Sequence, residues 1–421
     1  MPITPTYPGV YIEEIPSGVR TIVGVATSIA AFIGYFTKGP MDKAVQIFSM
    51  ADFEREFGGL NINSEASYAI QQFFLNGGSE AWVIRTASGN PCKADVQIQD
   101  GIEGITALTV TSISEGIWGN NLRVSIDLNT TDPSNLFNMV VNEYVGSRIN
   151  RSESFRNLSM NSADENFVET VVNDDRTGSK LVQVNAGNST LPLPNGTVSG
   201  NLAVFPSLTS SSPTVDVTID TDTASAVLSS VPTTLTQARS ILEAAIRKAK
   251  PDNTSFASAR VEIQDKKYLR VLSGSGNPSN RITFATSASD TTTVVELKLD
   301  TLSGATNNVQ EYTLGAGTAI GSSAQGDGES GQDGNPPDGS ALIGDRASKT
   351  GIYALEDVDL FNILCIPRTA IVSGTNLLPS TEAATVISVA TSYCEERRAF
   401  FLMDTPNDID ETQEIKDWLD E

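Results

Sequence analysis

The chain has 421 residues, enough for two or three domains, and 39% of them are hydrophobic, which is typical of a folded protein. It has 28 Lys and Arg against 51 Asp and Glu, a net charge of −23, which argues against a nucleic-acid groove and against an anionic membrane as partners. It has no histidine, so a Ser-His-Asp triad, a Cys-His pair and a zinc site that needs imidazole are excluded.

The first predicted element is an extended arm over residues 1–20, which contains the stretch YPGVYIEEIPSG at residues 7–18. Proline has no N–H to donate to a strand ladder, and the residue before a proline favours extended geometry. Pro8 and Pro16 therefore argue against a central strand of the chain's own sheet. Two interpretations remain open: a disordered or surface-bound terminus, and an arm that adds a strand to the sheet of another subunit.

Residues 21–37, TIVGVATSIAAFIGYFT, contain no charge and are predicted to form one or two buried strands. The stretch is shorter than the ~20 apolar residues of a membrane-spanning helix. Acidic Glu13 and Glu14 precede it, whereas a signal peptide begins with basic residues. We therefore expect a protein that is made and folded in the cytoplasm. The three cysteines, which form no C-x-x-C motif, predict no disulfide framework: Cys92, Cys365 and Cys394.

The segment 21–90 continues as a compact α/β unit. A strand is predicted over residues 45–48, and a short helix follows in which Phe53 and Phe57 share one face and Gly58-Gly59 ends the helix. Ser64 is the expected N-cap of a second helix. That helix has an apolar stripe: Ala66, Ala69, Ile70, Phe73 and Phe74. A strand over residues 81–85 closes the unit.

From about residue 91 the sequence changes to short alternating runs between turn residues. Residues 91–215 predict an inserted β-sandwich domain. Residues 216–320 predict an inserted α+β module, with a helix over 235–249 and strands over 259–264, 267–273, 281–286 and 294–299. Residues 321–345 are rich in glycine and acidic residues and predict a flexible linker. Their carboxylates do not have the spacing of an EF-hand calcium loop.

The α/β order returns over residues 346–421. A strand over 360–366, a helix from Ser380 or Thr381, a strand over 400–403 and a helix from Ile409 are predicted. Strand, helix, strand in this order implies a parallel pair with a crossover. The predicted fold class is therefore one α/β core built from both chain ends, with β-rich and small α+β modules inserted between them.

No catalytic, cofactor or metal site is predicted. The sequence has no GxxxxGK[ST] loop, and the glycines of residues 315–321 have one residue too many for G-x-G-x-x-G. The acidic pairs Glu395-Glu396 and Asp174-Asp175 occupy adjacent positions beside basic residues, so they are expected on the solvated surface.

Several motifs together resemble a known family. YPGVYIEEIPSG, VGVATSIAAFIGYFTKGP, SMADFEREFGG and FFLNGGSEAWVIR are similar to the N-terminal part of contractile tail sheath proteins of bacteriophages, phage-tail-like bacteriocins and related injection systems. EGIWGNNLRVSIDL, SESFRNLSMN and NFVETVVND resemble the β-sandwich insertion of that family. GIYALEDVDLFNILCIP and SYCEERRAFFLMDTP resemble its later core segment. The motifs span most of the chain in the family's order.

The resemblance implies a structural function without an active site. Sheath subunits stack as hexameric rings around an inner tube, and the array contracts on a baseplate signal to drive the tube through a target envelope, without nucleotide hydrolysis. The implied core is subtilisin-like. The implied partners are neighbouring sheath subunits, the tube protein, and baseplate and tail terminator proteins, with no nucleic acid and no membrane. The implied location is the virion tail or particle sheath, assembled in the bacterial cytoplasm.

The resemblance also assigns the arm. In the family the N-terminal arm crosses to a neighbouring subunit and joins a sheet there. The residues expected to form that link are Pro8, Gly9, Val10, Tyr11, Ile12, Glu13, Glu14 and Ile15. Family members continue beyond SYCEERRAFFLMDTP into a portion that contacts the tube and supplies the acceptor strands. This chain ends at IKDWLDE, so relative to the family it is expected to lack that portion.

Two other classes of protein, an enzyme and an adhesin, are alternatives to a sheath subunit. An enzyme is disfavoured because the sequence has no base–nucleophile pair, and a fold does not by itself specify a function. An adhesin is compatible with the Thr- and Ser-rich insertion, but neither an export signal nor fibre repeats are visible. Location discriminates between the two remaining classes, since an adhesin lies at a particle tip and a sheath lies along the whole tail.

Overall fold

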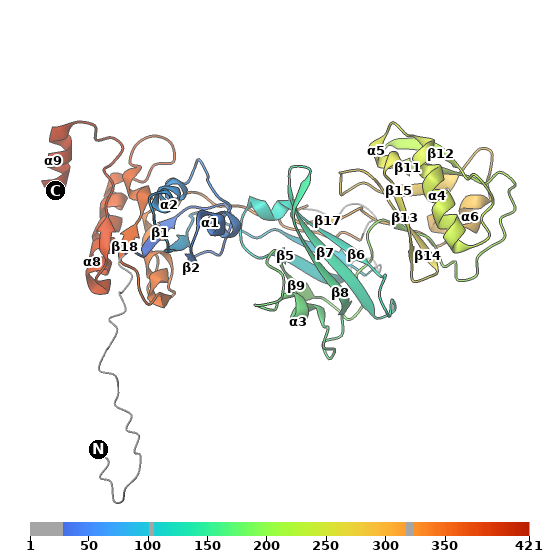
Figure 1. Ribbon diagram of the computed structural model, residues 1–421, viewed down its shortest axis with the longest axis horizontal. Helices are drawn as coiled ribbons and strands as arrows, with labels where there is room; N and C mark the ends of the chain where they lie inside the picture. Colours follow the sequence, from blue (N-terminus) through green and yellow to red (C-terminus); the bar gives the residue numbers. More distant parts are fainter. Residues whose placement is uncertain (1–27, 101–104, 317–323, 421) are drawn as a thin grey trace, which may run out of the picture.

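The computed structural model describes residues 28–100, 105–316 and 324–420, and these residues form three bodies in a row (Figure 1). The core consists of residues 28–90 and 336–420. The proximal insertion, in the middle of the row, consists of residues 91–195 and 308–335. The distal insertion, at the far end, consists of residues 196–307. Each body has its own buried hydrophobic cluster or clusters, so the chain is a multidomain mixed α/β protein.

The core contains a five-stranded sheet in the order β19-β18-β1-β3-β2. Four strands are parallel: β1 (Ala30–Gly34), β3 (Ala81–Arg85), β18 (Ile363–Cys365) and β19 (Phe400–Leu402). β2 (Ala44–Ile47) is antiparallel to β3 at one edge. Strands from the two ends of the chain pair directly, which confirms the prediction that both ends build one α/β core.

Different helices cover the two faces of this sheet. Because side chains alternate along a strand, Ala30 and Phe32 of β1 face α1 (Met50–Phe57) and α2 (Glu65–Leu75). Ala31 and Ile33 face the opposite layer. That layer contains α7 (Gly339–Ile343), the 3₁₀ segment η3 (Gly351–Asp357) and α8 (Ser380–Arg397). α9 (Thr412–Asp420) follows β19 on the outer side of α8 (Figure 1).

Local signals set the helix ends as the sequence predicted. Ser64 caps α2 by accepting the Ser67 N–H, and α1 ends at Gly58, whose φ of 89° lies in the left-handed region that favours glycine. The aromatic face of α1 is also as predicted, because Phe53 and Phe57 are fully buried and pack on Phe36 with ring centroids 5.3 and 5.2 Å away.

The proximal insertion is a two-sheet sandwich. One sheet has the order β17-β6-β7-β8 and the other has the order β4-β5-β9. Their strands are β4 (Asp95–Gln99), β5 (Thr106–Ser112), β6 (Leu122–Asp127), β7 (Leu136–Val145), β8 (Arg148–Ser159), β9 (Val182–Ala186) and β17 (Tyr312–Thr313). Alternate residues of both sheets share one buried cluster, which α3 (Val168–Val172) and the 3₁₀ turn η1 (Ile117–Asn121) border.

The distal insertion also has two small sheets, in the orders β13-β14-β10-β16 and β12-β11-β15. Their strands are β10 (Thr197–Val198), β11 (Thr214–Ile219), β12 (Asp222–Val227), β13 (Arg260–Gln264), β14 (Tyr268–Leu272), β15 (Ile282–Thr286) and β16 (Thr306–Asn307). The helix α4 (Leu235–Ala249), followed by α5 (Thr254–Ala257), has the predicted bounds and buries the predicted stripe, including Leu242 and Ile246.

One predicted strand of this module is wrong. Residues 294–299, VVELKL, form the short helix α6 (Thr293–Glu296) and the turn after it. The Asp290 carboxylate fixes this conformation by accepting hydrogen bonds from the N–H groups of Thr292 and Thr293, at 2.9 and 3.1 Å. Val294 and Leu297 then lie one turn apart and are both fully buried. Burial at helical spacing therefore overrides the β propensity of the valines.

The predicted flexible linker is also wrong for its described part, residues 324–345. Residues 324–332 run antiparallel to β4, with the Gln97 N–H donating to Asp327 O at 3.0 Å and the Gly326 N–H donating to Gln97 O at 2.8 Å. A Cβ on Gly328 would lie 2.4 Å from Asp95 O. The glycines therefore allow close approach of two backbones, a role that composition does not distinguish from flexibility.

The expected divisions between the inserted modules differ from the packing. The division expected between residues 215 and 216 falls inside β11, and β10 pairs with β14 of the distal insertion. β17 pairs with β6 of the proximal insertion. The chain therefore leaves the proximal insertion near residue 195 and returns to it near residue 308, a long-range pairing that local patterns do not encode.

Candidate assembly surface at the edge of the core sheet

The predicted site residues, Pro8 to Ile15 of the arm, lie outside the described residues. The surface to which an extended segment could add is described, and it lies at the β19 edge of the core sheet. Among the described strands, β19 pairs only with β18, in the register Ile363 opposite Phe400 and Cys365 opposite Leu402. An edge strand of this kind presents unpaired backbone N–H and C=O groups to a further strand.

The side chains of β19 divide between the two faces. Phe401 packs against the cluster under α8. Phe400 and Leu402 point the other way, and they are 76% and 52% exposed. The adjoining Met403 is 43% exposed. Three large apolar side chains are thus exposed at one sheet edge, which is typical of a surface that a partner covers.

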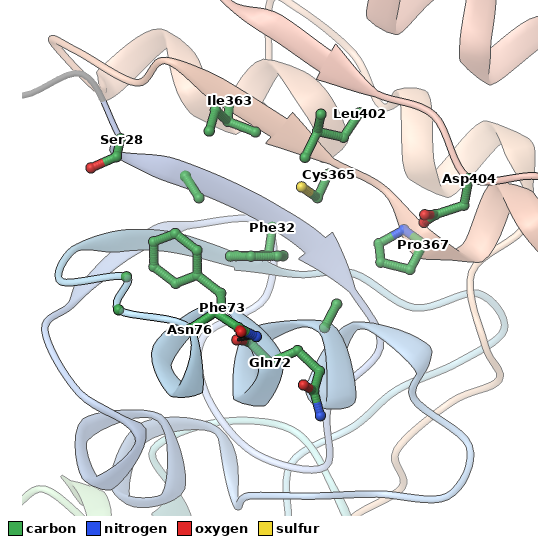
Figure 2. Close-up of a pocket in the computed structure, with 14 residues that line it drawn as sticks. Ser28, Phe32, Gln72, Phe73, Asn76, Ile363, Cys365, Pro367, Leu402 and Asp404 are labelled. Atoms are coloured by element: carbon green, nitrogen blue, oxygen red, sulfur yellow. Dashed lines mark hydrogen bonds between the residues drawn. The ribbon is translucent and has the colours of Figure 1, made fainter.

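A groove of about 520 Å³ continues this apolar surface under the sheet (Figure 2). It forms because α1 and α2 cover β1, β3 and β2 on this face, and no described helix covers β18 and β19 there. Figure 2 shows Phe32, Phe73, Ile363 and Leu402 around the same space. The amides of Gln72 and Asn76 border it on the α2 side (Figure 2).

The ionisable groups of this groove are Cys365 and Asp404. Burial, and then the nearby Asp404 charge, raise the pKa of the Cys365 thiol to about 12, so the thiol is neutral and a poor nucleophile near pH 7. Burial raises the pKa of the Asp404 carboxyl as well. The fourteen lining residues include no Lys, Arg or His. The groove is therefore mainly apolar, with one carboxyl at Asp404, and it is suited to bind apolar side chains and an extended backbone.

No group of three or more His, Cys, Asp or Glu is placed to hold a metal ion among the described residues, including the acidic residues 324–345. Across the same residues, no helix combines the length and the apolar character needed to cross a bilayer.

Sequence patterns predicted the strands of this surface but not the surface itself. A strand was predicted over residues 400–403, and the alternation of side chains along a strand places Phe400 and Leu402 on one face but does not indicate whether that face is covered. Phe73 belongs to the predicted stripe of α2, where it was expected in the core. It is half-buried and borders the groove, because α2 ends beside β1 before it reaches β18.

Comparison with known proteins gives structural matches only. No family model matches the sequence, and no curated protein does. Two solved structures that match are sheath tail proteins, from Listeria innocua and from Desulfitobacterium hafniense.

The matches are limited in extent. The Listeria innocua protein has 16% identity and a TM-score of 0.27, over 41% of this chain and 32% of that chain. The Desulfitobacterium hafniense protein has 17% identity and a TM-score of 0.27, over 44% of this chain and 37% of that chain. The match thus spans about a third of the length of each relative. At this TM-score no residue-by-residue correspondence is taken from it, so the function is argued from the chain's own sequence and fold.

Proposed function

We propose that the chain is the subunit of a contractile tail sheath. The observation behind the proposal is that the family motifs, which are scattered along the sequence, meet in one sheet. VGVATSIAAFIGYFTKGP contains β1, FFLNGGSEAWVIR contains β3, GIYALEDVDLFNILCIP contains β18 and SYCEERRAFFLMDTP contains β19. These four strands are adjacent. Segments from the two ends of the chain that resemble one family and form one sheet, such as β1 and β18 with Ala30 opposite Ile363, support a shared core.

In this role the subunit polymerises as stacked hexameric rings around an inner tube, and the array contracts to drive the tube through a target cell envelope. New contacts between subunits supply the work, since the sequence has no P-loop and no histidine. The partners are neighbouring copies, the tube protein, and baseplate and terminator proteins. The location is the tail of a virion or a related particle. Helices on both faces of a mostly parallel sheet also support a subtilisin-like core.

The arm is proposed to link neighbouring subunits. Val10, Tyr11, Ile12, Glu13, Glu14 and Ile15 pair with a neighbour's sheet by main-chain hydrogen bonds, and alternate side chains provide the fit. In the described part of the chain, β19 and its apolar groove offer a suitable edge. The exposed Phe400 and Leu402 are then covered by the added strand.

The test is removal of residues 1–17 from the chain. We expect unchanged circular dichroism, because the core sheet is formed by residues 30 onward, and loss of ordered tubes in negative-stain electron microscopy. A matched control replaces residues 8–15 by a Gly-Ser segment of equal length, which keeps the linker but removes the strand, and it is expected to behave like the deletion. Normal tubes from both variants contradict the role of the arm.

Particle location tests the function itself. Antibodies against the distal insertion are expected to label the whole tail of particles that contain the chain. Label confined to the particle tip contradicts a sheath and supports an adhesin.

A further inference from the structure

A second groove, of about 480 Å³, lies where the core meets the proximal insertion. Its rim has five cations and one carboxylate, Glu56, although the whole chain has nearly twice as many acidic as basic residues. The cations are Lys38, Lys43, Arg55, Arg151 and Lys180. Gly39, Pro40 and Ile113 line the same groove between them. We call this surface the basic groove.

Three of these cations have partners within the fold. Lys38 Nζ is 2.7 Å from Glu143, Arg151 is 2.9 Å from Glu153, and Arg55 pairs with Asp52 and Glu56 at 2.8 and 3.0 Å. Their charges are therefore balanced locally.

The other two cations, Lys43 and Lys180, are exposed and form no ion pair with any described residue. The Lys180 ammonium donates only to the Asp175 backbone carbonyl, at 2.5 Å. In the basic groove Lys43 thus carries a charge without an ion-pair partner among the described residues. The Lys180 charge acts on the nearby Asp174 carboxylate, whose pKa is lowered by local hydrogen bonds and then by this charge; Pro40 and Ile113 add apolar surface. The chemistry of the groove fits an acidic, amphipathic segment.

The chain itself contains such a segment. Residues 408–420 have six carboxylates against one lysine, and three of the six lie in α9. Glu414 and Asp417 are three residues apart on one face of α9, and Asp410 lies just before the helix, where its N–H donates to the Glu414 carboxylate at 3.3 Å; we call these three residues the acidic stripe. Ile415 and Trp418 occupy the adjacent face.

The acidic stripe is free to bind elsewhere. In the described residues, the hydrogen bonds of α9 are all within the segment itself, such as Gln413 Nε2 to Asp417 at 2.7 Å and the Ile415 N–H to Glu411 O at 3.1 Å. Neither Glu414 nor Asp417 forms an ion pair with a described residue of another element.

α9 does not reach the basic groove of its own chain. Figure 1 shows α9 on the outer side of α8, whereas α1, which supplies Arg55 to the groove, lies on the opposite side of the core, beside the proximal insertion. We propose that α9 of one copy docks in the basic groove of a second copy. Its acidic stripe meets Lys43 and Lys180, and its apolar face lies on Pro40 and Ile113.

The two surfaces are different, so the contact is head-to-tail and is repeated from copy to copy, as in a ring or a filament. The inference rests on the proposed function in one respect, that the partner is a second copy. It adds an electrostatic contact that is separate from the arm and from the β19 edge. Because exposed charges are screened by salt, the contact is expected to weaken as ionic strength rises.

The test uses charge reversal in the full chain and sedimentation velocity at about 50 mM and about 500 mM salt. The groove variant is Lys43→Glu with Lys180→Glu, and the tail variant is Asp410→Lys with Glu414→Lys and Asp417→Lys. We expect salt-sensitive association of the wild type and at least a tenfold loss in each variant at low salt. Lys248→Glu with Lys266→Glu, in the distal insertion, is a control with the groove variant's charge change and is expected to associate like the wild type.

The decisive measurement is made on a mixture of the two variants. The groove variant and the tail variant each repel themselves, but in a mixture every groove meets a tail of opposite charge, so association is expected to return. Any one of three results overturns the inference: the wild-type chains do not associate, the variants associate like the wild type, or the mixture stays dissociated. Normal tubes from the groove variant, together with none from the arm deletion, also overturn it while leaving the proposed function in place.

Discussion

The capping carboxylate of Asp290 gives the sharpest prediction for the stability of the distal insertion. Asp290 is 6% exposed and accepts five hydrogen bonds, from the Thr214, Thr292 and Thr293 N–H groups at 2.9, 2.9 and 3.1 Å and from the Thr292 and Thr293 hydroxyls at 3.1 and 2.5 Å. Asp290→Ala leaves buried donors on Thr214 and Thr293 without an acceptor. At ~1–3 kcal/mol for each such donor, the expected loss is about 3 kcal/mol.

The assay is hydrogen exchange of the α6 amides, whose acceptors include Thr292 O for Glu296 and Thr293 O for Leu297. A loss of about 3 kcal/mol corresponds to protection lower by roughly a hundredfold in the variant. Asp252→Ala, an exposed carboxylate of the same module, is the control and is expected to change nothing. Protection within threefold of the wild type in Asp290→Ala refutes the reasoning, because the carboxylate then does not hold α6.

The same carboxylate gives the effect a pH dependence of known sign. Burial acts to raise the pKa of Asp290, but the hydrogen bonds from Thr293, Thr214 and Thr292 outweigh it and lower the pKa well below its ordinary value. A group with a lowered folded-state pKa stabilises the protein above its unfolded pKa, near 3.9, and this stabilisation is lost as the pH falls. The difference in stability between the wild type and Asp290→Ala, measured as protection of the α6 amides, is therefore expected to be largest at pH 7 and to become smaller below about pH 4.

Three further predictions concern the joins and the buried thiols. Removing residues 91–337 is expected to leave a folded core. Removing residues 91–345 also deletes α7 with its fully buried Leu342, so the free energy of unfolding measured in urea is expected to be about 3 kcal/mol lower than for the shorter deletion. Arg270→Met removes a guanidinium of the distal insertion that donates to two backbone carbonyls of the proximal insertion, Asn195 O and Ile126 O, and it is expected to raise hydrogen exchange in β10 and β6 at least tenfold, while Arg270→Lys recovers part of the protection. Burial raises the pKa of Cys365 to about 12 and of Cys394 to about 11, so iodoacetamide at pH 8 is expected to label both only after unfolding; fast labelling of the native chain contradicts this.

Sequence patterns predicted the elements whose signals are local. The helices α1, α2 and α4 and the strand β3 were placed within a residue or two, because apolar spacing, Ser64 and Gly58 define them without distant contacts. The parallel order of β18 and β19 followed from strand, helix and strand. Elements fixed by distant partners were missed, since α6 depends on Asp290 and on burial beside β11 and β15, and residues 324–332 depend on the free edge of β4.

The surfaces were less predictable than the elements. The groove at the β19 edge exists because no described helix covers β18 and β19 on that face, and a sequence pattern gives no sign of a missing cover. The basic groove brings together Lys38, Lys43 and Arg55 of the core with Arg151 and Lys180 of the proximal insertion. Basic residues that are far apart in an acidic sequence do not indicate a shared site, because only the folded structure shows that they are neighbours.

The outgoing and returning chains between core and insertions are hydrogen-bonded to each other. The Cys92 N–H donates to Gln332 O at 3.1 Å and the Gln332 N–H donates to Cys92 O at 3.0 Å, and Ser88 and Asn335 form a second bridge nearer the core. Everything beyond this pair is attached to the core through two adjacent, hydrogen-bonded segments and through side-chain contacts such as Lys38 with Glu143 and Arg85 with Glu115 O. A foreign domain whose termini lie equally close is therefore expected to be accepted at this junction, provided that it supplies new partners for these core side chains.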